Sequence, residues 1–423
     1  MMALKVAPAA ALLLLGSATL LIDEAVLRGS GRLQAGVMTL LLVSGWSTLV
    51  LAASALPFPR WRFFGLALFL AGGAALPVAV LIGFHWSTGI PLDMHDGMFQ
   101  TQVVAERLLS GHDPYGTDFT KTALVEWFHY TPEGSAIAHH YVYFPLVVLL
   151  AVPVVALEGL AGLGSDLRPM TLAISFAAAI IVFRAPFGWR VRHLLLALLF
   201  LDPYFGWMEG RNDILWLAPI VAASGLWMRD RRLPATILIG VAAALKIFAW
   251  PFALFMGLTL LLGWRRRDTP AREVVAGLAA LSLPMALTGL PFLLWNPHAF
   301  FDDTAGWLMA SPPGFPIYGF GLGEALYLTH LLPTTSSPFP FTLVQAGLGL
   351  PVLIAGVRAL RRDASIANIL GPATVLLAVI VLCGRFTNDN YLASLLLLFA
   401  LTIAAARTAQ GRTATRPVLP AAA

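Results

Sequence analysis

The chain has 423 residues, of which 58% are hydrophobic and only 12% are charged, whereas soluble domains carry roughly 25% charged residues, so the composition excludes a soluble globular enzyme. The formal net charge is +5, but the arginines stand in short clusters beside apolar stretches, as in membrane proteins, so we expect no nucleic-acid partner. The single cysteine, Cys383, excludes an intrachain disulfide, and the chain has no CxxC or HExxH metal motif.

Apolar stretches near the length of a membrane-spanning helix recur along the whole chain. A helix of about 20 residues crosses the ~30 Å hydrocarbon core, so we predict an all-α, polytopic membrane protein with about 11 to 13 membrane segments. One transmembrane domain should cover residues 1–407, and a short, disordered cytoplasmic tail should cover residues 408–423. The predicted spans are 7–22, 34–53, 62–84, 141–160, 169–185, 193–206, 213–228, 272–294, 341–359, 364–383 and 390–406.

The apolar block 233–264 differs from these spans because it carries Lys246 and Pro251 near its middle. Arginines flank the block on both sides, so both of its ends should lie in the cytoplasm. An even number of crossings must then separate the ends. We therefore predict a hairpin of two short helices whose turn, from Lys246 to Pro251, points to the outer side. Pro251 should supply the break, because proline removes a backbone donor and clashes with the preceding helical turn.

The same charge rule places the long loops 85–140 and 295–340 outside, and it is self-consistent over the C-terminal half. In the N-terminal half, simple alternation is wrong by one crossing, because it puts the arginines near residues 184–192 and 229–232 outside. One segment between 141 and 206 must therefore be re-entrant or doubled. We assign this irregularity to 141–160, where Pro145 and Pro153 would split the segment into half-helices that line a cavity.

The start of the first outer loop is crowded with titratable side chains. Residues Met98–Leu109 have the pattern of an amphipathic helix at a membrane surface, with Gln100 and Gln102 on its polar face, and Gly111 and Pro114 should end it. Acids at the N-terminus of this helix would stay ionised and could act as a general base. The alternative is that they only solubilise an exposed loop. The side chains concerned are Asp93, His95, Asp96, Glu106, Asp113 and Asp118.

The sequence leaves a metal requirement open. His95 with Asp93 and Asp96 offers imidazole and carboxylate ligands that suit Mg²⁺, Mn²⁺ or Zn²⁺, although a solvated histidine is the simpler interpretation. No glycine-rich dinucleotide motif is found, so no nucleotide cofactor is expected.

Several of these features, taken in order, resemble a known family. The order of Asp96, Phe99, Gly111, Pro114 and Tyr115 resembles the first outer-loop signature of GT-C glycosyltransferases that use polyprenyl-phosphate sugars, with Phe99 where that signature has tyrosine. Further matches lie within residues 85–265, and they are closest to the bacterial polyprenyl-phosphate-mannose-dependent mannosyltransferases. They are Tyr143, Phe144 and Pro145 followed by Pro153; Gly210, Arg211, Asn212 and Asp213, with Arg211 replacing glutamine; and Ala243, Ala244, Leu245 and Lys246 before Pro251.

The resemblance implies an integral protein of a bacterial inner membrane whose active site faces the periplasm or the extracellular side. It implies transfer of a sugar, with mannose suggested by the nearest members, from a polyprenyl-phosphate donor to a hydroxyl of a lipid-linked or glycan acceptor, with inversion. Asp96 would take the proton from that hydroxyl, and Asp93 is the alternative base. Membrane lipids are the other expected partners.

A lipid-phosphate leaving group needs cations near the membrane, and a sugar needs aromatic and polar contacts. Lys246 is the strongest phosphate candidate, because a lysine in an apolar hairpin is costly, although it could also snorkel to an interface. Arg211 could instead form a structural ion pair, and the aromatic residues of the loop 295–340 are also typical of membrane interfaces. The phosphate candidates are Lys246, Arg211, Arg385 and His140, and the substrate candidates are Tyr115, Tyr143, Asn212, Asp213 and Tyr318.

The alternative function is a polytopic transporter or flippase of a lipid-linked or polar substrate. The hairpin around Lys246 has the broken-helix character of a transport site. However, the acids concentrate in an outer loop, and no matching second half of the chain is apparent.

Overall fold

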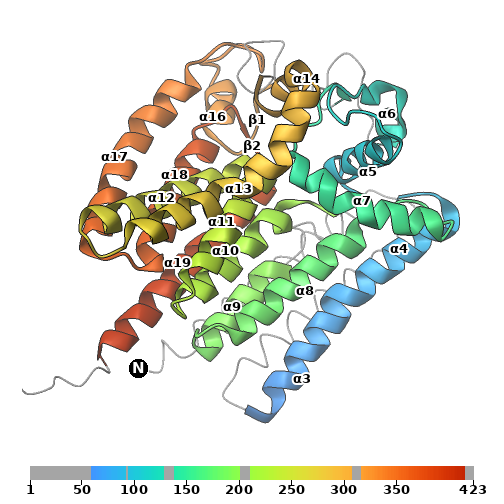
Figure 1. The fold of residues 1–423 in the computed structure, drawn as a ribbon. Helices are drawn as coiled ribbons and strands as arrows, with labels where there is room; N and C mark the ends of the chain where they lie inside the picture. The colour runs from blue at the N-terminus through green and yellow to red at the C-terminus, as the bar shows by residue number, and fades with distance from the viewer. Residues whose placement is uncertain (1–58, 92–93, 128–137, 201–209, 307–315, 415–423) are drawn as a thin grey trace, which may run out of the picture.

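The computed structural model describes residues 59–91, 94–127, 138–200, 210–306 and 316–414 (Figure 1). This part of the chain is predominantly helical and holds one pair of two-residue parallel strands. The predicted spans 7–22 and 34–53 lie outside the described residues, as does Asp93.

Each predicted span from residue 62 onward is helical where the structure describes it, although residues 201–206 of the span 193–206 lie outside the described residues. The N-terminal half contains α3 (Pro59–Leu70), which continues through a π-helical turn (Ala71–Ala75) into α4 (Leu76–Thr88), and then α5 (Asp96–Leu109), α6 (Ala123–Trp127), α7 (Pro145–Leu160), α8 (Arg168–Arg184), α9 (Trp189–Phe200) and α10 (Asp213–Trp227). The C-terminal half contains α11 (Arg232–Leu245), the 3₁₀ turn η4 (Ile247–Ala249), α12 (Trp250–Arg265), α13 (Ala271–Trp295), α14 (Pro297–Phe301), α16 (Leu322–Leu328), α17 (Phe341–Arg362), α18 (Ile366–Leu382) and α19 (Asp389–Ala414).

Within the described residues, four helical segments are long and apolar enough to cross a membrane, which indicates a membrane protein. They also expose large apolar side chains, including Leu294 (80% exposed) and Leu343 (72% exposed), which a soluble protein would not gather on its surface. The four segments are Ile247–Arg265, Ala271–Trp295, Phe341–Arg362 and Asp389–Thr408.

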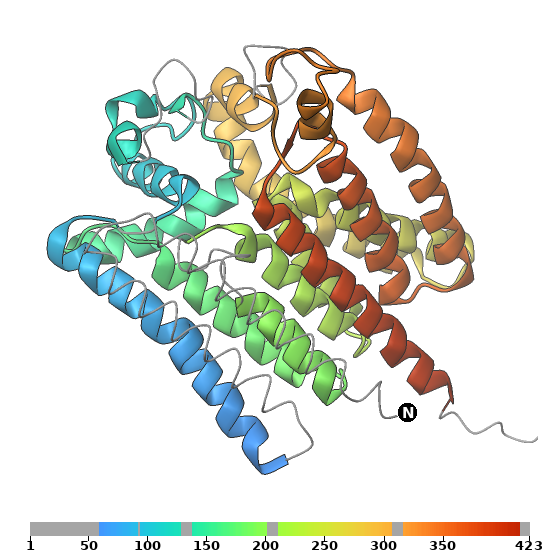
Figure 2. The ribbon, with the colours of Figure 1, turned by 180° about the vertical axis from the view of Figure 1, so that it is seen from behind.

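The helices run between two ends of the bundle that differ in composition. At the end that we call the arginine end, α8 and α10 finish side by side, with Arg229 donating to the carbonyl of Arg184. There α12 and α17 also meet, with Arg266 donating to the carbonyl of Arg361 at 2.9 Å. At the opposite end, which we call the loop end, lie the C-terminus of α4, helix α5, the turn between α11 and α12, and the start of α19 (Figures 1 and 2).

Helix α7 begins and ends at the loop end. Before its first residue, Phe144 stacks on Trp250 at the start of α12, with ring centroids 6.0 Å apart. After its last residue, Asp166 lies 2.9 Å from Nδ1 of His85 in the last turn of α4. Helix α7 therefore lies beside α5 across the loop end, as Figures 1 and 2 show.

The predicted split of residues 141–160 into half-helices is wrong. Pro145 occupies the first turn of α7, where a missing backbone donor costs nothing, and Pro153 lies inside one continuous helix. The segment is irregular because α7 lies across the loop end and does not run between the two ends of the bundle. The helix itself is not broken.

The predicted hairpin is confirmed, but its break is five residues earlier than Pro251. Lys246 has extended backbone angles (φ −153°, ψ 138°) and ends α11, whereas Pro251 lies in the first turn of α12. The predicted tail also begins later than expected, because α19 continues to Ala414, and residues 415–423 lie outside the described residues.

Helix α5 is confirmed, but the expected exposure of its polar face is not. Gln100 is 1% exposed and Gln102 is 4% exposed, since this face packs against the rest of the protein. Gln100 donates to the carbonyl of His140 at 3.2 Å, so a protein partner replaces the water that the sequence pattern predicts.

Helices α11 and α13 approach so closely that Gly240 has no room for a side chain. A Cβ atom there would lie 2.6 Å from the carbonyl oxygen of Leu281 and 2.7 Å from that of Ala280. We expect Gly240→Ala to lower the free energy of unfolding by about 1–3 kcal/mol, because the two backbones must move apart. The matched control is Gly83→Ala in α4, where a Cβ would meet nothing within 4 Å. Equal unfolding midpoints for the two variants in detergent would contradict this prediction.

Candidate functional site

The buried centre of the loop end is an ion pair between Asp213 and Lys246. Asp213 starts α10 and is 1% exposed, and its Oδ1 lies 2.6 Å from Nζ of Lys246. The same carboxylate accepts hydrogen bonds from Nε1 of Trp216 (3.0 Å) and from Nδ2 of Asn390 in α19. Because Lys246 sits where α11 stops, its side chain leaves the helix axis and reaches this carboxylate.

Two aromatic rings and one amide complete the surroundings of the Lys246 ammonium. Its Nζ lies 5.2 Å from the ring centroid of Phe248 and 5.7 Å from that of Tyr391, distances at which a cation is attracted to the ring face. Oδ1 of Asn212 accepts a longer hydrogen bond of 3.4 Å from the same Nζ. Asp213 therefore compensates and positions Lys246, which is a different role from the substrate contact that we predicted for Asp213.

Arg211 provides a second cation at the same place. Its Nη1 lies 2.7 Å from Oδ1 of Asp389, and the side chains of Arg211 and Asp389 are 14% and 47% exposed. A guanidinium presents five donors in a planar fork that matches phosphate geometry. An exposed carboxylate partner can be exchanged for an incoming phosphate at a lower desolvation cost than a buried one. Arg211 is therefore better suited than Lys246 to bind phosphate directly.

Asp96, the predicted base, lies next to this cluster. Gly97, which follows Asp96 at the start of α5, packs so closely on Tyr143 that a Cβ there would lie 2.0 Å from its hydroxyl oxygen. Burial raises the pKa of the Tyr143 hydroxyl well above its usual value, and the charges of Asp96 and Asp213 raise it further. Tyr143 therefore stays protonated between the two carboxylates.

The turn that carries Arg211 is in contact with the same helix. A Cβ on Gly210 would lie 2.0 Å from the terminal methyl of Met98 in α5. Gly210 also has a positive φ of 77°, which glycine adopts without strain. The structure thus brings together Asp96, Tyr143, Arg211, Asn212, Asp213 and Lys246 from separate parts of the sequence.

Asp96 has near neighbours of its own at the start of α5. Its Oδ1 accepts from the backbone N–H of Gly97 at 2.6 Å and lies 2.9 Å from Nδ1 of His95. The Asp96 side chain is 12% exposed. A carboxylate held by a backbone donor at a helix N-terminus is favoured in its ionised form, which a general base requires.

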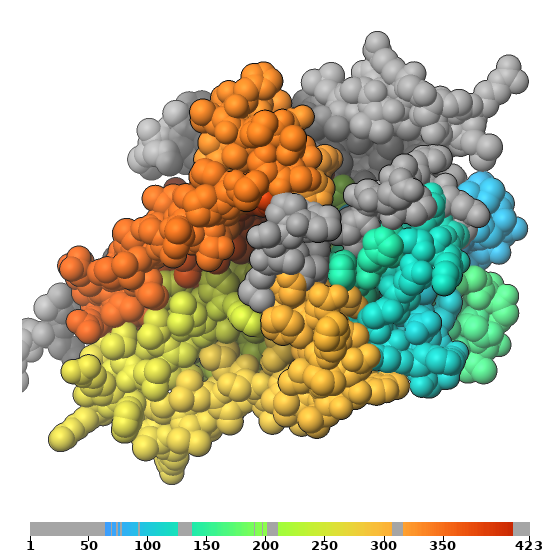
Figure 3. All heavy atoms as spheres, turned by 90° about the horizontal axis from the view of Figure 1, so that it is seen from above, coloured from blue at the N-terminus to red at the C-terminus, as the bar shows by residue number. Residues whose placement is uncertain are grey.

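His140 belongs to a different cluster, which joins the loop before α7 to the segment after α14. Its Nδ1 lies 2.9 Å from Oδ1 of Asp303 and 3.8 Å from Oδ2 of Asp302, and the other oxygen of Asp303 accepts from the backbone N–H of Gly116 at 2.8 Å. The hydrogen bond to Asp303 raises the pKa of His140 above its usual value. The segments containing α5–α6 and α13–α14 lie side by side in Figure 3. His140 thus lies beside two carboxylates, and its contact with a donor phosphate stays a prediction.

The same cluster is where the described residues could hold a metal ion. One ligand atom from each of His140, Asp302 and Asp303 lies within 4.8 Å of the others, and this ligand set suits a divalent cation. The His95 and Asp96 pair lacks a described third ligand, because Asp93 lies outside the described residues.

Tyr115, Arg385 and Tyr318 have other surroundings. Tyr115 is 3% exposed, and its hydroxyl donates to the carbonyl of Tyr143 at 3.0 Å, so it links the loop after α5 to the segment before α7. Arg385 donates to the carbonyl of Ser337 at 2.6 Å, and burial lowers its pKa.

Tyr318 lies on the exposed side of the candidate site. It is 61% exposed, and it belongs to β1 (Tyr318–Gly319), which pairs with β2 (Phe386–Thr387). Its ring stacks on Phe386 at 5.9 Å, and Phe386 in turn lies 5.8 Å from Tyr391. A row of aromatic rings therefore runs from the surface to Lys246.

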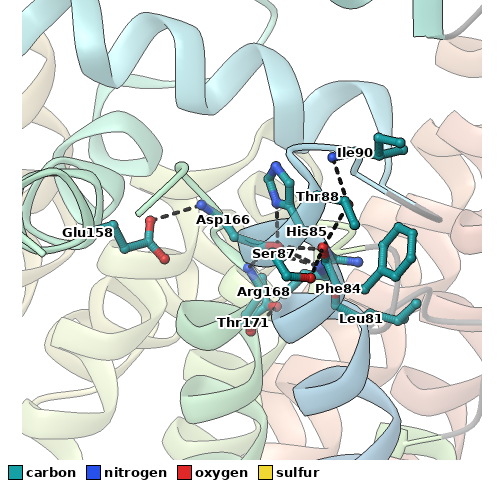
Figure 4. Close-up of polar contacts among 10 residues, drawn as sticks. All are labelled: Leu81, Phe84, His85, Ser87, Thr88, Ile90, Glu158, Asp166, Arg168 and Thr171. Atoms are coloured by element: carbon teal, nitrogen blue, oxygen red, sulfur yellow. Dashed lines mark hydrogen bonds and ion pairs between the residues drawn. The ribbon is translucent and has the colours of Figure 1, made fainter. Parts of the chain in front are cut away.

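A buried ionic network supports the candidate site (Figure 4). Arg168 and Asp166 are both fully buried, and Nε of Arg168 lies 3.0 Å from Oδ1 of Asp166. His85 contacts the same carboxylate, and Glu158 accepts from the backbone N–H of Asp166 at 2.9 Å. The side chain of Arg168 packs against Gly210, where a Cβ would lie 3.1 Å from its Cγ. The network thus ties α4, α7 and α8 to the turn that carries Arg211.

Sequence reasoning offered the polar cluster that contains Asn390 as a lining of the site, but it missed the pairing of Asn390 with Asp213, and it missed Tyr391 and the Arg168 network. Asn390 lies 177 residues from Asp213 in sequence, and no local spacing rule reports such a pairing. The one available signal was the cluster of polar residues at 385–390 directly before a span.

The chain matches no family model, no curated protein and no solved structure.

Proposed function

We propose that the chain is an integral membrane glycosyltransferase that moves a sugar from a polyprenyl-phosphate donor to a hydroxyl of a lipid-linked or glycan acceptor. The observation that carries this proposal is the meeting of Asp96 with Arg211 and Lys246 around Tyr143 and Tyr391 at one end of an apolar bundle. A carboxylate base and phosphate-binding cations are the two functions that such a transfer needs.

The direction of α7 supports the membrane orientation that the proposal requires. Helix α7 begins and ends at the loop end, so it adds no membrane crossing. The helices before and after α7 can then alternate in direction, and the error of one crossing in the N-terminal half disappears. The ends of α8, α10, α12 and α17 then all carry their arginines on one side, which the positive-inside rule assigns to the cytoplasm. The loop end, with the candidate site, then faces the periplasm of a bacterial inner membrane.

The chemistry follows from the charges at the site. The acceptor hydroxyl gives its proton to Asp96, and its oxygen forms a bond to the anomeric carbon from the side opposite the donor phosphate. The bond from the anomeric carbon to the phosphate oxygen breaks, and the phosphate leaves with the electron pair. Arg211 stabilises the negative charge of this leaving group, and Lys246, held by Asp213, adds a fixed positive potential.

A transporter or flippase remains the second candidate, and one observation favours it. The Asp213–Lys246 pair is buried at a broken helix between long apolar segments, as in many transport sites. Transport does not account for a base on an outer-loop helix, whereas transfer uses both features.

The test is transfer by the purified protein. We expect label from radioactive polyprenyl-phosphate mannose to move to a new lipid or glycan when a membrane lipid extract supplies the acceptor. Donors that carry glucose or arabinose on the same polyprenyl phosphate test which sugar the protein transfers. No transfer from any of the three donors, together with movement of the labelled lipid across vesicles that contain the protein, would replace the transferase with a flippase.

A further inference from the structure

We propose that five arginines at the arginine end bind the phosphate headgroups of anionic phospholipids. Arg266 joins the two turns that carry them, because its Nη1 donates to the carbonyls of Leu360 (3.3 Å) and Arg361 (2.9 Å). The turn after α12 and the end of α17 therefore form one surface. We call this surface the arginine patch, and it consists of Arg265, Arg267, Arg358, Arg361 and Arg362.

The arginine patch is strongly cationic, because its five positive charges are only partly offset by the neighbouring Asp363. All five side chains are exposed. The two nearest acids along the chain have other partners, since Asp268 pairs with Arg266 at 2.9 Å and Asp363 accepts from Asn368. Among the described residues, no acid lies within ion-pair distance of the five arginines. An anion from outside the chain is the partner that this surface fits.

The backbone at Arg267 is a second, independent observation. Arg267 has a φ of 65°, in the left-handed region that disfavours an L side chain. Its N–H donates to the carbonyl of Trp264 and the N–H of Asp268 to that of Gly263, a helix end at which glycine is the usual residue. An arginine at this position adds conformational strain that glycine would avoid, and it also adds a cation to the patch.

The position of the patch favours a lipid over a soluble partner. One turn before the patch, Leu261 is 42% exposed and Trp264 is 56% exposed. Both lie on α12, which is apolar enough to cross a membrane, and an exposed tryptophan beside arginines is typical of the interface between headgroups and hydrocarbon. The patch therefore lies at headgroup depth, where each arginine is attracted to anionic lipid.

This inference depends on membrane insertion but not on glycosyl transfer, so each can fail without the other. The experiment compares the full chain in nanodiscs of phosphatidylcholine alone with nanodiscs that also contain phosphatidylglycerol, and the readout is the thermal unfolding midpoint. We expect phosphatidylglycerol to raise the midpoint of the wild type and high salt to reduce this shift, because salt screens the attraction.

The variants separate charge from backbone strain. Arg267→Gly should match or exceed the wild-type midpoint in phosphatidylcholine, because glycine relieves the strain, yet it should gain less from phosphatidylglycerol. The triple variant Arg267→Gly, Arg361→Gln, Arg362→Gln should lose most of the gain. The control is Lys121→Gln, an exposed cation at the loop end (85% exposed), which should keep the full gain.

Two results would overturn the proposal. An equal phosphatidylglycerol shift in the wild type and in the triple variant would show that the patch does not bind the lipid. Stabilisation by inorganic phosphate or an acidic peptide in phosphatidylcholine nanodiscs, without any shift from phosphatidylglycerol, would assign the patch to a soluble anion.

Discussion

Replacing Arg168 by methionine should lower the free energy of unfolding by about 3–5 kcal/mol at neutral pH. Arg168 and Asp166 are both fully buried, and methionine keeps much of the side-chain volume while it removes the charge. The variant leaves the Asp166 carboxylate buried with His85 as its remaining ionisable partner. A buried charge that has lost its main partner is far more costly than the loss of an exposed ion pair.

The matched control for this variant is an exposed ion pair. Asp268→Asn breaks the contact with Arg266, whose side chain is 34% exposed while that of Asp268 is 62% exposed. We expect this change to cost less than about 1 kcal/mol. Denaturation in mixed micelles measures both variants, and similar losses for the two would contradict the prediction.

The pH dependence of the Arg168 variant has a definite sign. In the wild type, burial raises the pKa of Asp166, but hydrogen bonds from His85 and Arg168 outweigh burial and hold it below 3.8. This carboxylate therefore adds stability above pH 3.8, and that contribution is lost as the pH falls through the lower folded pKa. In Arg168→Met the effect of burial should dominate and raise the pKa. Protonation should then neutralise the buried Asp166 carboxylate of the variant. The difference in free energy of unfolding between the variant and the wild type should therefore shrink as the pH is lowered toward 4.

Replacing Asp96 by asparagine should reduce sugar transfer about 10²- to 10⁴-fold, the usual contribution of a general base. Asparagine keeps the shape of the side chain and can still accept the hydrogen bond from Gly97, so the fold and the binding of the lipid donor should be unchanged. The measurement is the rate of label transfer beside the affinity for the donor. A variant with normal transfer would show that Asp96 is not the base.

Two further variants locate the base within the loop. Asp118→Asn changes an acid of the same loop whose side chain is 45% exposed, and it should leave transfer unchanged. Asp93→Asn tests the alternative base. If Asp93→Asn alone were inactive, the base would move to Asp93, and the transferase itself would stand.

The helices were predictable from the sequence because long apolar runs have few other stable forms in a membrane. Hydrophobicity indicates that a segment is buried in lipid or protein, but it does not indicate the direction of the helix relative to the rest of the bundle. The direction of α7 depends instead on contacts at its two ends, such as Asp166 with His85. Pro153 was misleading for a related reason, since a proline removes one donor without always breaking the helix.

Several residues of the candidate site were predictable from the sequence, but the residues with which they pair were not. Lys246 stood out because a charge within an apolar hairpin needs an explanation, and Asp96 stood out because it precedes an amphipathic helix and matches the position of an acid in the resembled signature. Their partners did not stand out, because the pairing of Lys246 with Asp213, and of Asp213 with Asn390, depends on tertiary packing over 33 and 177 residues. The buried glutamines of α5 show the same limit, since an amphipathic pattern does not reveal whether water or protein covers the polar face.

Asp389 and Asn390 begin α19, the final helix of the described chain. Synthesis proceeds from the N-terminus, so α10 and the hairpin enter the membrane before α19 has left the ribosome. Asp213 and Lys246 meet at that stage, whereas Arg211 still lacks Asp389 and the Asp213 carboxylate still lacks the amide of Asn390. The candidate site of the nascent chain is therefore incomplete until α19 is inserted.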